Sequence, residues 1–468
     1  MAIVGGGITG LTAALLLSQQ GQQVTLLEAG RLGMGTTGRS TGNLYATVDE
    51  RLSKLRKRWD DETMRAVVQS RRAALELIHD SVMAHKIDCD LRPAAFHFFA
   101  EADADEHREF LEEESEALRT AGLAPVLTSD LGLPFPVSLG LRVEGQWQIH
   151  PLRYVHGLAD ALRHGCRLYE DTPALSIDDD SGTITTPNGS VRAEHILLAT
   201  HIPKGVYAIQ AFLAPVREFG VAAEMTSPVL GPGIFWRLDR PGRSVRSVRS
   251  VGPLIMAVGE PFKTGHNEHS PEAVQALEEY LGLRFRCQPF RYRWAGQAYR
   301  SADGLPLIGR HGQRTYLMTG FATDGLVYGT LAAMLACDAV LGRTNPWAKL
   351  YDPHRVSARG ASQILKEAAD NLSHYLRDLP GAADTSGFEE VRVGEGRLVE
   401  LDSQKWAVHR DTDGKLHVVS AVCTHMKCIV RWNDLERSWD CPCHGSRFNT
   451  DGEVLEGPAL SPLPRKET

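Results

Sequence analysis

The sequence predicts an α/β nucleotide-binding domain followed by a small all-β domain that holds a metal centre. Two observations lead to this prediction. Three consecutive glycines follow a short apolar strand at the start of the chain, and an apolar helical pattern follows them. Four of the eight cysteines lie between Cys423 and Cys443, among histidines, which favours metal over a disulfide framework. At roughly 150 residues per domain, the chain of 468 residues predicts two or three domains.

Composition argues against several classes of protein. Hydrophobic residues make up 43% and charged residues 23% of the chain, as in ordinary globular proteins. The net charge of -7 offers no basic field for nucleic acid, so we expect no nucleic-acid partner. No apolar run reaches the ~18 residues of a membrane span. The first apolar stretch, over 8–17, follows glycines and no basic segment, so we expect no signal peptide and a cytoplasmic location.

The first elements are predicted to be a strand, a glycine turn, a helix and a strand. The apolar run 2–4 predicts a strand, 8–20 has helical spacing that Gly21 ends, and 24–27 is typical of a buried parallel strand. The later segments are predicted as helices over 63–86, 101–120, 151–164 and 330–341, strands over 95–99 and 196–199, and an antiparallel sheet over 212–300. The acidic helix over 101–120 is expected to present a solvated face.

A change in composition near residue 386 predicts the domain boundary. Residues 356–386 are polar and end in a stretch rich in proline, glycine and aspartate, which predicts a helical segment and a linker. Beyond it the chain has short strand patterns. We therefore predict domains over 1–355 and 387–468, joined by 356–386.

The glycine turn has the spacing of a dinucleotide-binding fingerprint, Gly5-x-Gly7-x-x-Gly10. Gly5 allows the tight turn, Gly7 lets the backbone approach a pyrophosphate, and Gly10 lets helix and strand pack closely. The following helix directs its N-terminus at the phosphates. Glu28 ends the next strand, 18 residues after Gly10, where its carboxylate can accept hydrogen bonds from a ribose diol. A strand, a helix and the acidic residue Glu28 in this order and spacing predict a bound nucleotide.

Residues 33–42, 303–309 and 320–326 together resemble the flavin-binding signatures of the D-amino-acid oxidase and glycine oxidase superfamily, in the family's order. The resemblance implies FAD, a Rossmann-type domain and an interleaved antiparallel substrate domain, as in glutathione-reductase-like flavoproteins. Residues 172–174 resemble the stretch that meets the adenine. The implied FAD-binding residues are Gly35, Thr36, Thr37, Arg39, Ser40, Thr41, Ala174, Gly320, Thr323, Asp324, Gly325 and Leu326. Residues 323–326 should open a helix whose N-terminus stabilises charge at N1 and O2 of a reduced flavin.

The resemblance also bears on catalysis. Gln297 stands where sarcosine oxidases tether the flavin through cysteine, so a non-covalent flavin is implied. Lys263 matches their flavin-facing lysine, which implies a catalytic role over the flavin ring, although a surface lysine in a turn is the alternative. The positions of the family's substrate-binding cations hold Tyr45, Val48, Val327 and Ala298. Either Arg300 or Arg217 replaces those cations, or the substrate is not a simple α-amino acid, which we favour.

The cysteine-rich segment contains Cys423-x-His425 and Cys441-x-x-His444, with 15 residues between the two pairs. This pattern resembles the Rieske signature, in which two thiolates bind one iron and two imidazoles bind the other. Zinc also binds two cysteines and two histidines, but the spacing and the extra cysteines argue against it. In Rieske proteins of the cytochrome-complex type the positions of Cys428 and Cys443 form a disulfide. The resemblance therefore implies a [2Fe–2S] cluster and that disulfide.

A flavin takes two electrons as a hydride, whereas such a cluster passes one at a time. The combination predicts oxidation of a small-molecule amine at a C–N bond, with electrons leaving to a one-electron carrier such as a ferredoxin, cytochrome or quinone. The alternative is an electron-transfer protein in which an external reductase feeds the flavin through the cluster. An oxygenase would also need a mononuclear iron site, and the nearest histidine pair, His150 and His156, lacks a suitably spaced acid before His150.

Overall fold

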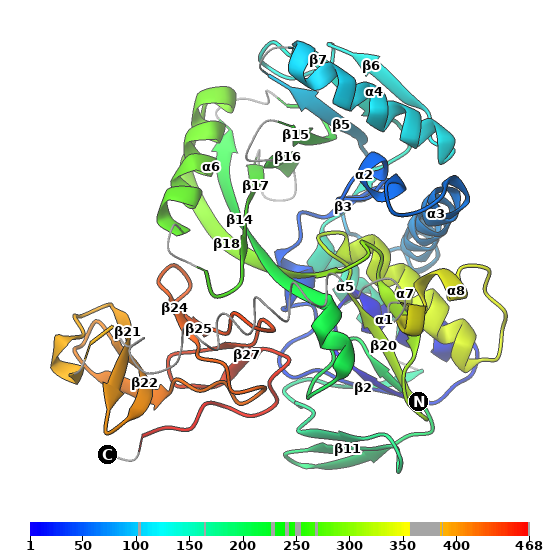
Figure 1. Ribbon diagram of the computed structural model, residues 1–468. Coiled ribbons are helices and arrows are strands. Elements are labelled where there is room, and N and C mark those ends of the chain that lie inside the picture. The colour runs from blue at the N-terminus through cyan, green and yellow to red at the C-terminus, as the bar shows by residue number, and fades with distance from the viewer. Residues whose placement is uncertain are drawn as a thin grey trace.

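The computed structural model describes residues 1–101, 104–162, 165–225, 230–238, 243–248, 254–266, 270–355, 384–385 and 387–466. Figure 1 shows a nucleotide-binding half near the N-terminus, a large sheet above it, and a C-terminal β domain, coloured orange to red, beside both. The predicted helical segment and linker over 356–386 lies outside the described residues, except for 384–385. No described helix is long and apolar enough to cross a membrane.

A six-stranded sheet forms the centre of the nucleotide-binding half. Its strands are ordered β19 (Leu307–Arg310), β20 (Thr315–Thr319), β13 (Ile196–Leu198), β1 (Ala2–Val4), β2 (Val24–Leu27) and β9 (Cys166–Tyr169). All neighbours are parallel except β19 and β20. Because parallel sheets are covered on both faces, their strands are apolar throughout, as β1 and β13 are.

Helices lie on one face of this sheet. They are α1 (Ile8–Gln19), α3 (Asp61–His85), α5 (Pro151–Ala161) and α7 (Gly325–Val340), of which α1 and α7 contact the strands. Helix α1 packs against α5 and α7, and α3 packs against α7, which explains why α1 is apolar around most of its circumference. Predicted helices and strands in this half are present with boundaries shifted by a few residues. The largest shift is in α7, which begins at Gly325 instead of 330.

Two small sheets and several short helices complete this half. The small sheets are β10 (Ser176–Asp178), β11 (Thr183–Thr186) and β12 (Gly189–Arg192), and β3 (Asn43–Leu44), β8 (Trp147–Gln148) and β4 (Arg92–Pro93). The short helices are α2 (Leu52–Arg56), α8 (Ala348–Tyr351) and the 3₁₀ helices η1 (Thr36–Arg39), η2 (Ala208–Phe212) and η3 (Pro353–Arg355). Of these, η1 carries part of the predicted FAD-binding tract.

The large sheet has eight strands. Their order is β18 (Cys287–Ser301), β14 (Leu213–Met225), β17 (Leu254–Lys263), β16 (Arg243–Val248), β15 (Gly233–Arg237), β5 (Ala95–Ala100), β7 (Leu139–Val143) and β6 (Pro125–Thr128). All pairs are antiparallel except β15 with β5. The prediction of an antiparallel sheet over 212–300 was therefore largely right. It missed α6 (Ser270–Phe285), whose buried Leu277, Leu281 and Phe285 have helical spacing and pack on the sheet.

Helix α4 (Ala104–Thr120) corrects a second expectation. Its acidic surface is not wholly solvated, because Glu114 is fully buried and accepts hydrogen bonds from the amides of Leu52 and Ser53 at 3.0 and 2.9 Å. Burial raises the pKa of Glu114, and these amides oppose the shift. Glu114 therefore caps the N-terminus of α2, a long-range role that the local acidic pattern does not reveal.

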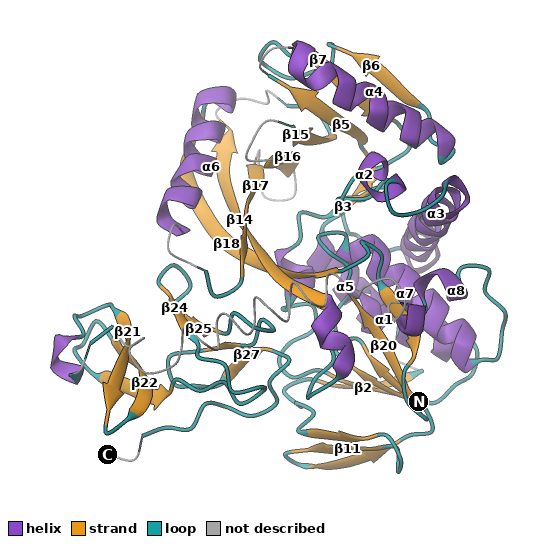
Figure 2. Cartoon of the chain, viewed as in Figure 1, coloured by secondary structure: helices purple, strands orange, loops and turns teal. Residues whose placement is uncertain are grey.

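The described part of the C-terminal domain, residues 387–466, is all β apart from η4 (Phe388–Glu390), as Figure 2 shows. One sheet holds β21 (Gly396–Leu401), β22 (Gln404–Arg410) and β23 (Leu416–Ser420), and the other holds β24 (Arg431–Asn433), β25 (Ser438–Asp440), β26 (Arg447–Phe448) and β27 (Val454–Glu456). Trp439, Phe448 and four buried cysteines share its core. The cysteine loops therefore lie on a packed support.

Candidate functional site

The N-terminal glycine turn has the geometry that its spacing predicts. Gly5 has φ +110°, and a Cβ atom there would lie 2.4 Å from the carbonyl oxygen of Ala199. A Cβ atom on Gly10 would lie 1.9 Å from the carbonyl oxygen of Gly5, so only glycine lets α1 pack this closely on β1. The Glu28 carboxylate accepts hydrogen bonds from the amides of Gly6 and Gly30 at 2.7 and 2.9 Å. These bonds fix the acid beside the turn.

A cavity of about 870 Å³ opens at this turn. The predicted FAD-binding residues that line it are Gly5, Gly7, Glu28, Gly35, Thr36, Thr37, Arg39, Ser40, Thr41, Ala174, Gly320, Thr323, Asp324, Gly325 and Leu326. Gly10 is the exception, since it serves the packing of α1. The Thr323 hydroxyl is buried and has no hydrogen-bond partner among the described residues. The size of the cavity, this hydroxyl and the missing Cβ atoms fit a dinucleotide such as FAD.

A buried charge network holds the N-terminus of α7 against the cavity. The Asp324 carboxylate pairs with Arg71 at 3.1 Å, accepts a hydrogen bond from the Asp49 amide at 3.0 Å, and accepts another from the Tyr45 hydroxyl. Burial raises the pKa of Asp324, and the Arg71 charge opposes this shift. Arg71 is fully buried and was missed by the sequence prediction. An arginine on the apolar face of the helix over 61–85 was the available signal.

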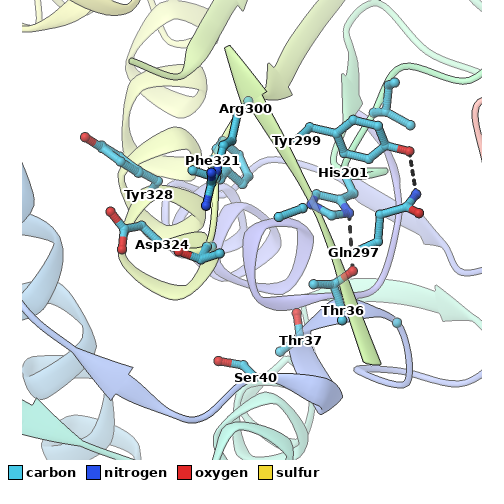
Figure 3. Close-up of a pocket in the computed structure, with 18 of the residues that line it drawn as sticks. Thr36, Thr37, Ser40, His201, Gln297, Tyr299, Arg300, Phe321, Asp324 and Tyr328 are labelled. Carbon is cyan, nitrogen blue, oxygen red and sulfur yellow. Dashed lines mark hydrogen bonds between the residues drawn. The ribbon is translucent and has the colours of Figure 1, made fainter. Parts of the chain in front are cut away.

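The far end of the cavity is formed by the large sheet, and Arg237 and Arg300 of this sheet both line it. Phe98, Trp236 and Ala298 line it. Arg300 also lines it and pairs with Asp49 at 3.5 Å and Glu218 at 3.8 Å. Burial, followed by the charge of Asp49, raises the pKa of Glu218 to about 7. Figure 3 shows Arg300 on the side of Asp324 and Tyr328, with Gln297 and Tyr299 on the side of His201.

Arg217, the other candidate for binding a substrate carboxylate, lies elsewhere. Its side chain is fully buried and pairs with Glu436 and, at 3.7 Å, with Glu456, both in the C-terminal domain. Its guanidinium also donates to Gln297 at 3.4 Å. Successive side chains of a strand point to opposite faces, so Arg217 and its neighbour Glu218 lie on opposite faces of β14. Glu218 lines the cavity, and Arg217 faces the C-terminal domain. Arg217 therefore belongs to the domain interface and does not line the cavity.

The four predicted cluster ligands meet at the tips of two loops. The rings of His425 and His444 are 5.0 Å apart and nearly perpendicular, and the Nδ1 atoms of both are buried without a hydrogen-bond partner among the described residues. Cys423 and Cys441 carry buried free thiols. Burial lowers the pKa of His444 to about 4, which favours the neutral imidazole that binds metal. Two free thiols, together with two imidazole nitrogens that have no hydrogen-bond partner among the described residues, fit a Rieske [2Fe–2S] cluster.

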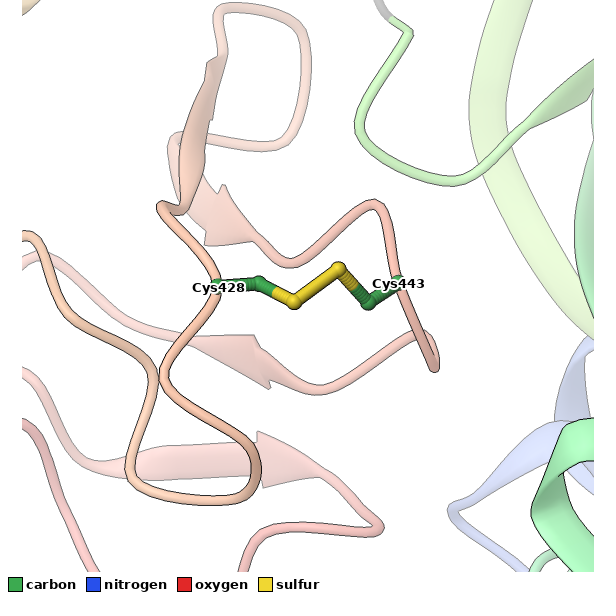
Figure 4. Close-up of a disulfide and its surroundings, with 2 residues drawn as sticks. All are labelled: Cys428 and Cys443. Carbon is green, nitrogen blue, oxygen red and sulfur yellow. A yellow bond between two sulfur atoms is a disulfide. The ribbon is translucent and has the colours of Figure 1, made fainter. Parts of the chain in front are cut away.

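Cys428 and Cys443 form a disulfide between the two loops (Figure 4). The pairing implied by the family resemblance is therefore present. The sulfur of Cys441 lies within 4.8 Å of both disulfide sulfurs. The disulfide thus ties together the loops that carry the four predicted ligands.

Strand β18 joins the cavity to the cluster loop. Gln297 and Tyr299 both line the cavity. The Gln297 side-chain amide donates to the carbonyl oxygen of Gly445 at 2.8 Å, and the Tyr299 hydroxyl donates to that of His444 at 3.4 Å. A Cβ atom on Gly445 would lie 2.7 Å from Pro215, so the backbones of the two domains approach closely. A single strand therefore separates the nucleotide cavity from a predicted cluster ligand.

Lys263 ends β17 opposite Val216 and is not among the described residues that line the cavity. A Cβ atom on Gly265, two residues further along the chain, would lie 2.9 Å from Pro442, so this turn lies against the cluster loop. The catalytic role of Lys263 stays a prediction.

A nucleotide cavity of this geometry, joined to a centre of two cysteines and two histidines, defines a flavoprotein with an iron–sulfur domain. Residues 1–339 match the family described as FAD dependent oxidoreductase, and residues 386–467 match the Rieske [2Fe-2S] domain. The chain belongs to this family of FAD-dependent oxidoreductases and carries a C-terminal Rieske domain. Its cofactors are FAD and a [2Fe–2S] cluster.

Proteins and structures similar to this chain support the assignment. A Bacillus subtilis protein described as "Putative Rieske 2Fe-2S iron-sulfur protein YhfW" is 30% identical over 99% of this chain and 92% of its own length. Gamma-glutamylputrescine oxidoreductase of Escherichia coli is 25% identical over 81% of this chain and 93% of its own. The structure of glycine oxidase from Geobacillus kaustophilus superposes with a TM-score of 0.60 and 20% identity, covering 74% of this chain and 95% of that one.

Proposed function

We propose that this enzyme oxidises a small amine at a C–N bond and delivers the electrons singly to a one-electron carrier. The contact that carries the proposal is that of Gln297, which lines the cavity and donates to Gly445 beside the predicted ligand His444. Oxidation of an amine to an imine releases two electrons and two protons, and water then hydrolyses the imine. Bound FAD would supply hydride acceptance and the cluster one-electron transfer, so each substrate molecule consumes two equivalents of a ferredoxin or cytochrome, or one equivalent of a quinone, which takes up the two electrons one after the other.

The cavity walls support substrate oxidation. Phe98 and Trp236 provide apolar surface that excludes water from a bound amine. The N-terminus of α7 directs its amides into the cavity, where they stabilise negative charge. Amine oxidation by hydride transfer depends mainly on positioning the C–H bond, and these walls supply a fixed frame.

The substrate is proposed to be other than a simple α-amino acid. Arg300 already contacts two carboxylates, those of Asp49 and Glu218, so a substrate carboxylate would have to displace them. Similarity to an enzyme named gamma-glutamylputrescine oxidoreductase agrees with an amine whose reactive nitrogen lies away from an α-carboxylate.

Anaerobic mixing of the protein with a panel of primary and secondary amines and α-amino acids tests the proposal. A true substrate is expected to bleach the flavin absorbance first and the cluster absorbance afterwards. The variant His425→Ala, which removes a predicted ligand, should retain the first phase and lose the second. If no amine bleaches the flavin but an external reductase reduces the cluster before the flavin, the electron-transfer alternative replaces this proposal.

A further inference from the structure

One carboxylate of the Rieske domain reaches into the predicted FAD-binding tract. Glu456, at the end of β27, pairs with Arg39 of η1 at 3.1 Å, with Arg447 at 2.9 Å and with Arg217 at 3.7 Å. Burial alone would raise the pKa of Glu456, but the three guanidinium groups outweigh it and hold the pKa at about 2. Glu456 is therefore ionised and joins three arginines from segments far apart in the chain.

The segment around Glu456 forms part of the cavity wall. Val454, Leu455, Glu456, Gly457, Ala459 and Leu460 all line the cavity that holds the dinucleotide fingerprint. The Gly205 amide donates to the carbonyl oxygen of Pro458 at 2.9 Å, and the Tyr299 hydroxyl donates to that of Gly457 at 3.1 Å. A Cβ atom on Gly457 would lie 2.5 Å from the amine of Lys204. The contact between the two domains therefore combines close packing with directional hydrogen bonds.

The first domain also depends on this contact electrostatically. Arg217 is fully buried, and both carboxylates with which it pairs belong to the Rieske domain. A buried cation left without a partner is strongly unfavourable. The Rieske domain therefore compensates a charge that the first domain buries, and undocking would leave that charge uncompensated.

We propose that the two domains build the FAD site jointly: residues 454–460 of the Rieske domain close one wall, and Glu456 is a positioning residue that holds Arg39 for the bound dinucleotide. The Rieske domain is then a structural part of the flavin site as well as an electron carrier. Linkage requires the converse, that bound FAD holds the Rieske domain in place by the same factor. This inference does not depend on which substrate the enzyme oxidises.

The direct test titrates FAD into FAD-free, cluster-loaded full-length protein and follows flavin fluorescence. Glu456→Gln is expected to raise the Kd for FAD at least tenfold while iron content, sulfide content and the cluster's electron paramagnetic resonance spectrum stay unchanged, and Glu456→Asp should recover part of the loss. Glu453→Gln is the matched control, because this acid lies on the same hairpin with its side chain 61% exposed. A wild-type Kd in Glu456→Gln would overturn the proposal.

A second measurement on the unmodified chain covers the case in which Glu456→Gln also loses its cluster. Hydrogen exchange of the FAD-free protein is compared with and without added FAD. Amides over 454–460 should exchange at least tenfold more slowly with FAD, whereas the β21–β22 hairpin, over 396–410, should not change. Equal exchange over 454–460 in both states would mean that the Rieske domain contributes nothing to the flavin site.

Discussion

At the scale of single residues, the roles of the cysteines divide sharply. Cys423 and Cys441 have free, buried thiols, while Cys428 and Cys443 are joined to each other. All four lie in one core. A cysteine that ligates iron and a cysteine that ties two loops should respond differently to the same substitution.

Cys428→Ser should therefore assemble a cluster with a normal spectrum that decays at least tenfold faster than in the wild type, because the loops are no longer tied. Cys423→Ser should prevent normal assembly, because a ligand is lost. Iron and sulfide content together with visible circular dichroism, followed over hours, check both. The ligand assignment would be wrong if Cys428→Ser abolished the cluster outright while Cys423→Ser did not.

Glu218 should make the free energy of unfolding of the holoenzyme depend on pH. Burial raises its pKa in the folded protein to about 7 from the ordinary value of 4.5. Between these values the folded state binds more protons, so the free energy of unfolding falls as pH rises through this window. Glu218→Gln should remove on the order of 2 kcal/mol of this fall. The pH dependence of the thermal midpoint measures it.

Glu224→Gln is the control for the Glu218 prediction. Glu224 lies on the same strand, is more exposed, and pairs with Arg291 at 3.4 Å. Its substitution should leave the pH dependence of the thermal midpoint as in the wild type. An unaltered slope in Glu218→Gln would count against the raised pKa.

At the scale of elements, the local patterns were the most predictable. The strand–turn–helix at the N-terminus and the cluster loops follow from the spacing of a few neighbouring residues, so both could be predicted. Glu114 could not, because its partners lie on another element and acidic patterns of this kind also occur on solvated helices. Arg71 stands on an apolar helix face, which was a signal, but its partner Asp324 lies on another element, so the pair could not be predicted. Helix α6 was overlooked because its helical spacing lies inside a long stretch of alternating strand pattern.

The junction of α3 and α7 depends on the Arg71–Asp324 pair, which is buried on both sides. Arg71→Met should lower the thermal midpoint of the FAD domain, by the equivalent of about 3–5 kcal/mol, because it leaves a buried carboxylate unpaired. The double variant Arg71→Met/Asp324→Asn should recover part of this loss, since it removes both charges. Differential scanning calorimetry compares the variants, and a double variant no more stable than the single one would refute the pairing argument.

At the scale of the whole molecule, the interface could not be predicted from sequence. Arg217 and Glu436 are 219 positions apart, and no local spacing relates them. The same holds for Lys263, whose surroundings depend on the docked Rieske domain. Deleting the Rieske domain is therefore a poor test of electron flow, because it also removes a cavity wall.

His425→Ala in the full chain is the better test of electron flow. Substrate should still bleach the flavin anaerobically, while turnover with cytochrome c as acceptor should fall at least tenfold more than turnover with oxygen, because the one-electron route is lost. Steady-state rates with the two acceptors check this. Equal retention of both activities would show that the cluster lies off the electron path.

A glycine at the domain contact has a consequence for protein engineering. Gly445 leaves room for Pro215 of the other domain, where any side chain would collide. A Rieske domain transplanted from another protein would have to reproduce this gap as well as the carboxylate of Glu456. The two domains of this enzyme are thus unsuited to free exchange as modules. For a productive chimera, the donor of the Rieske domain should be chosen first by the shape of its domain contact and only then by its redox properties.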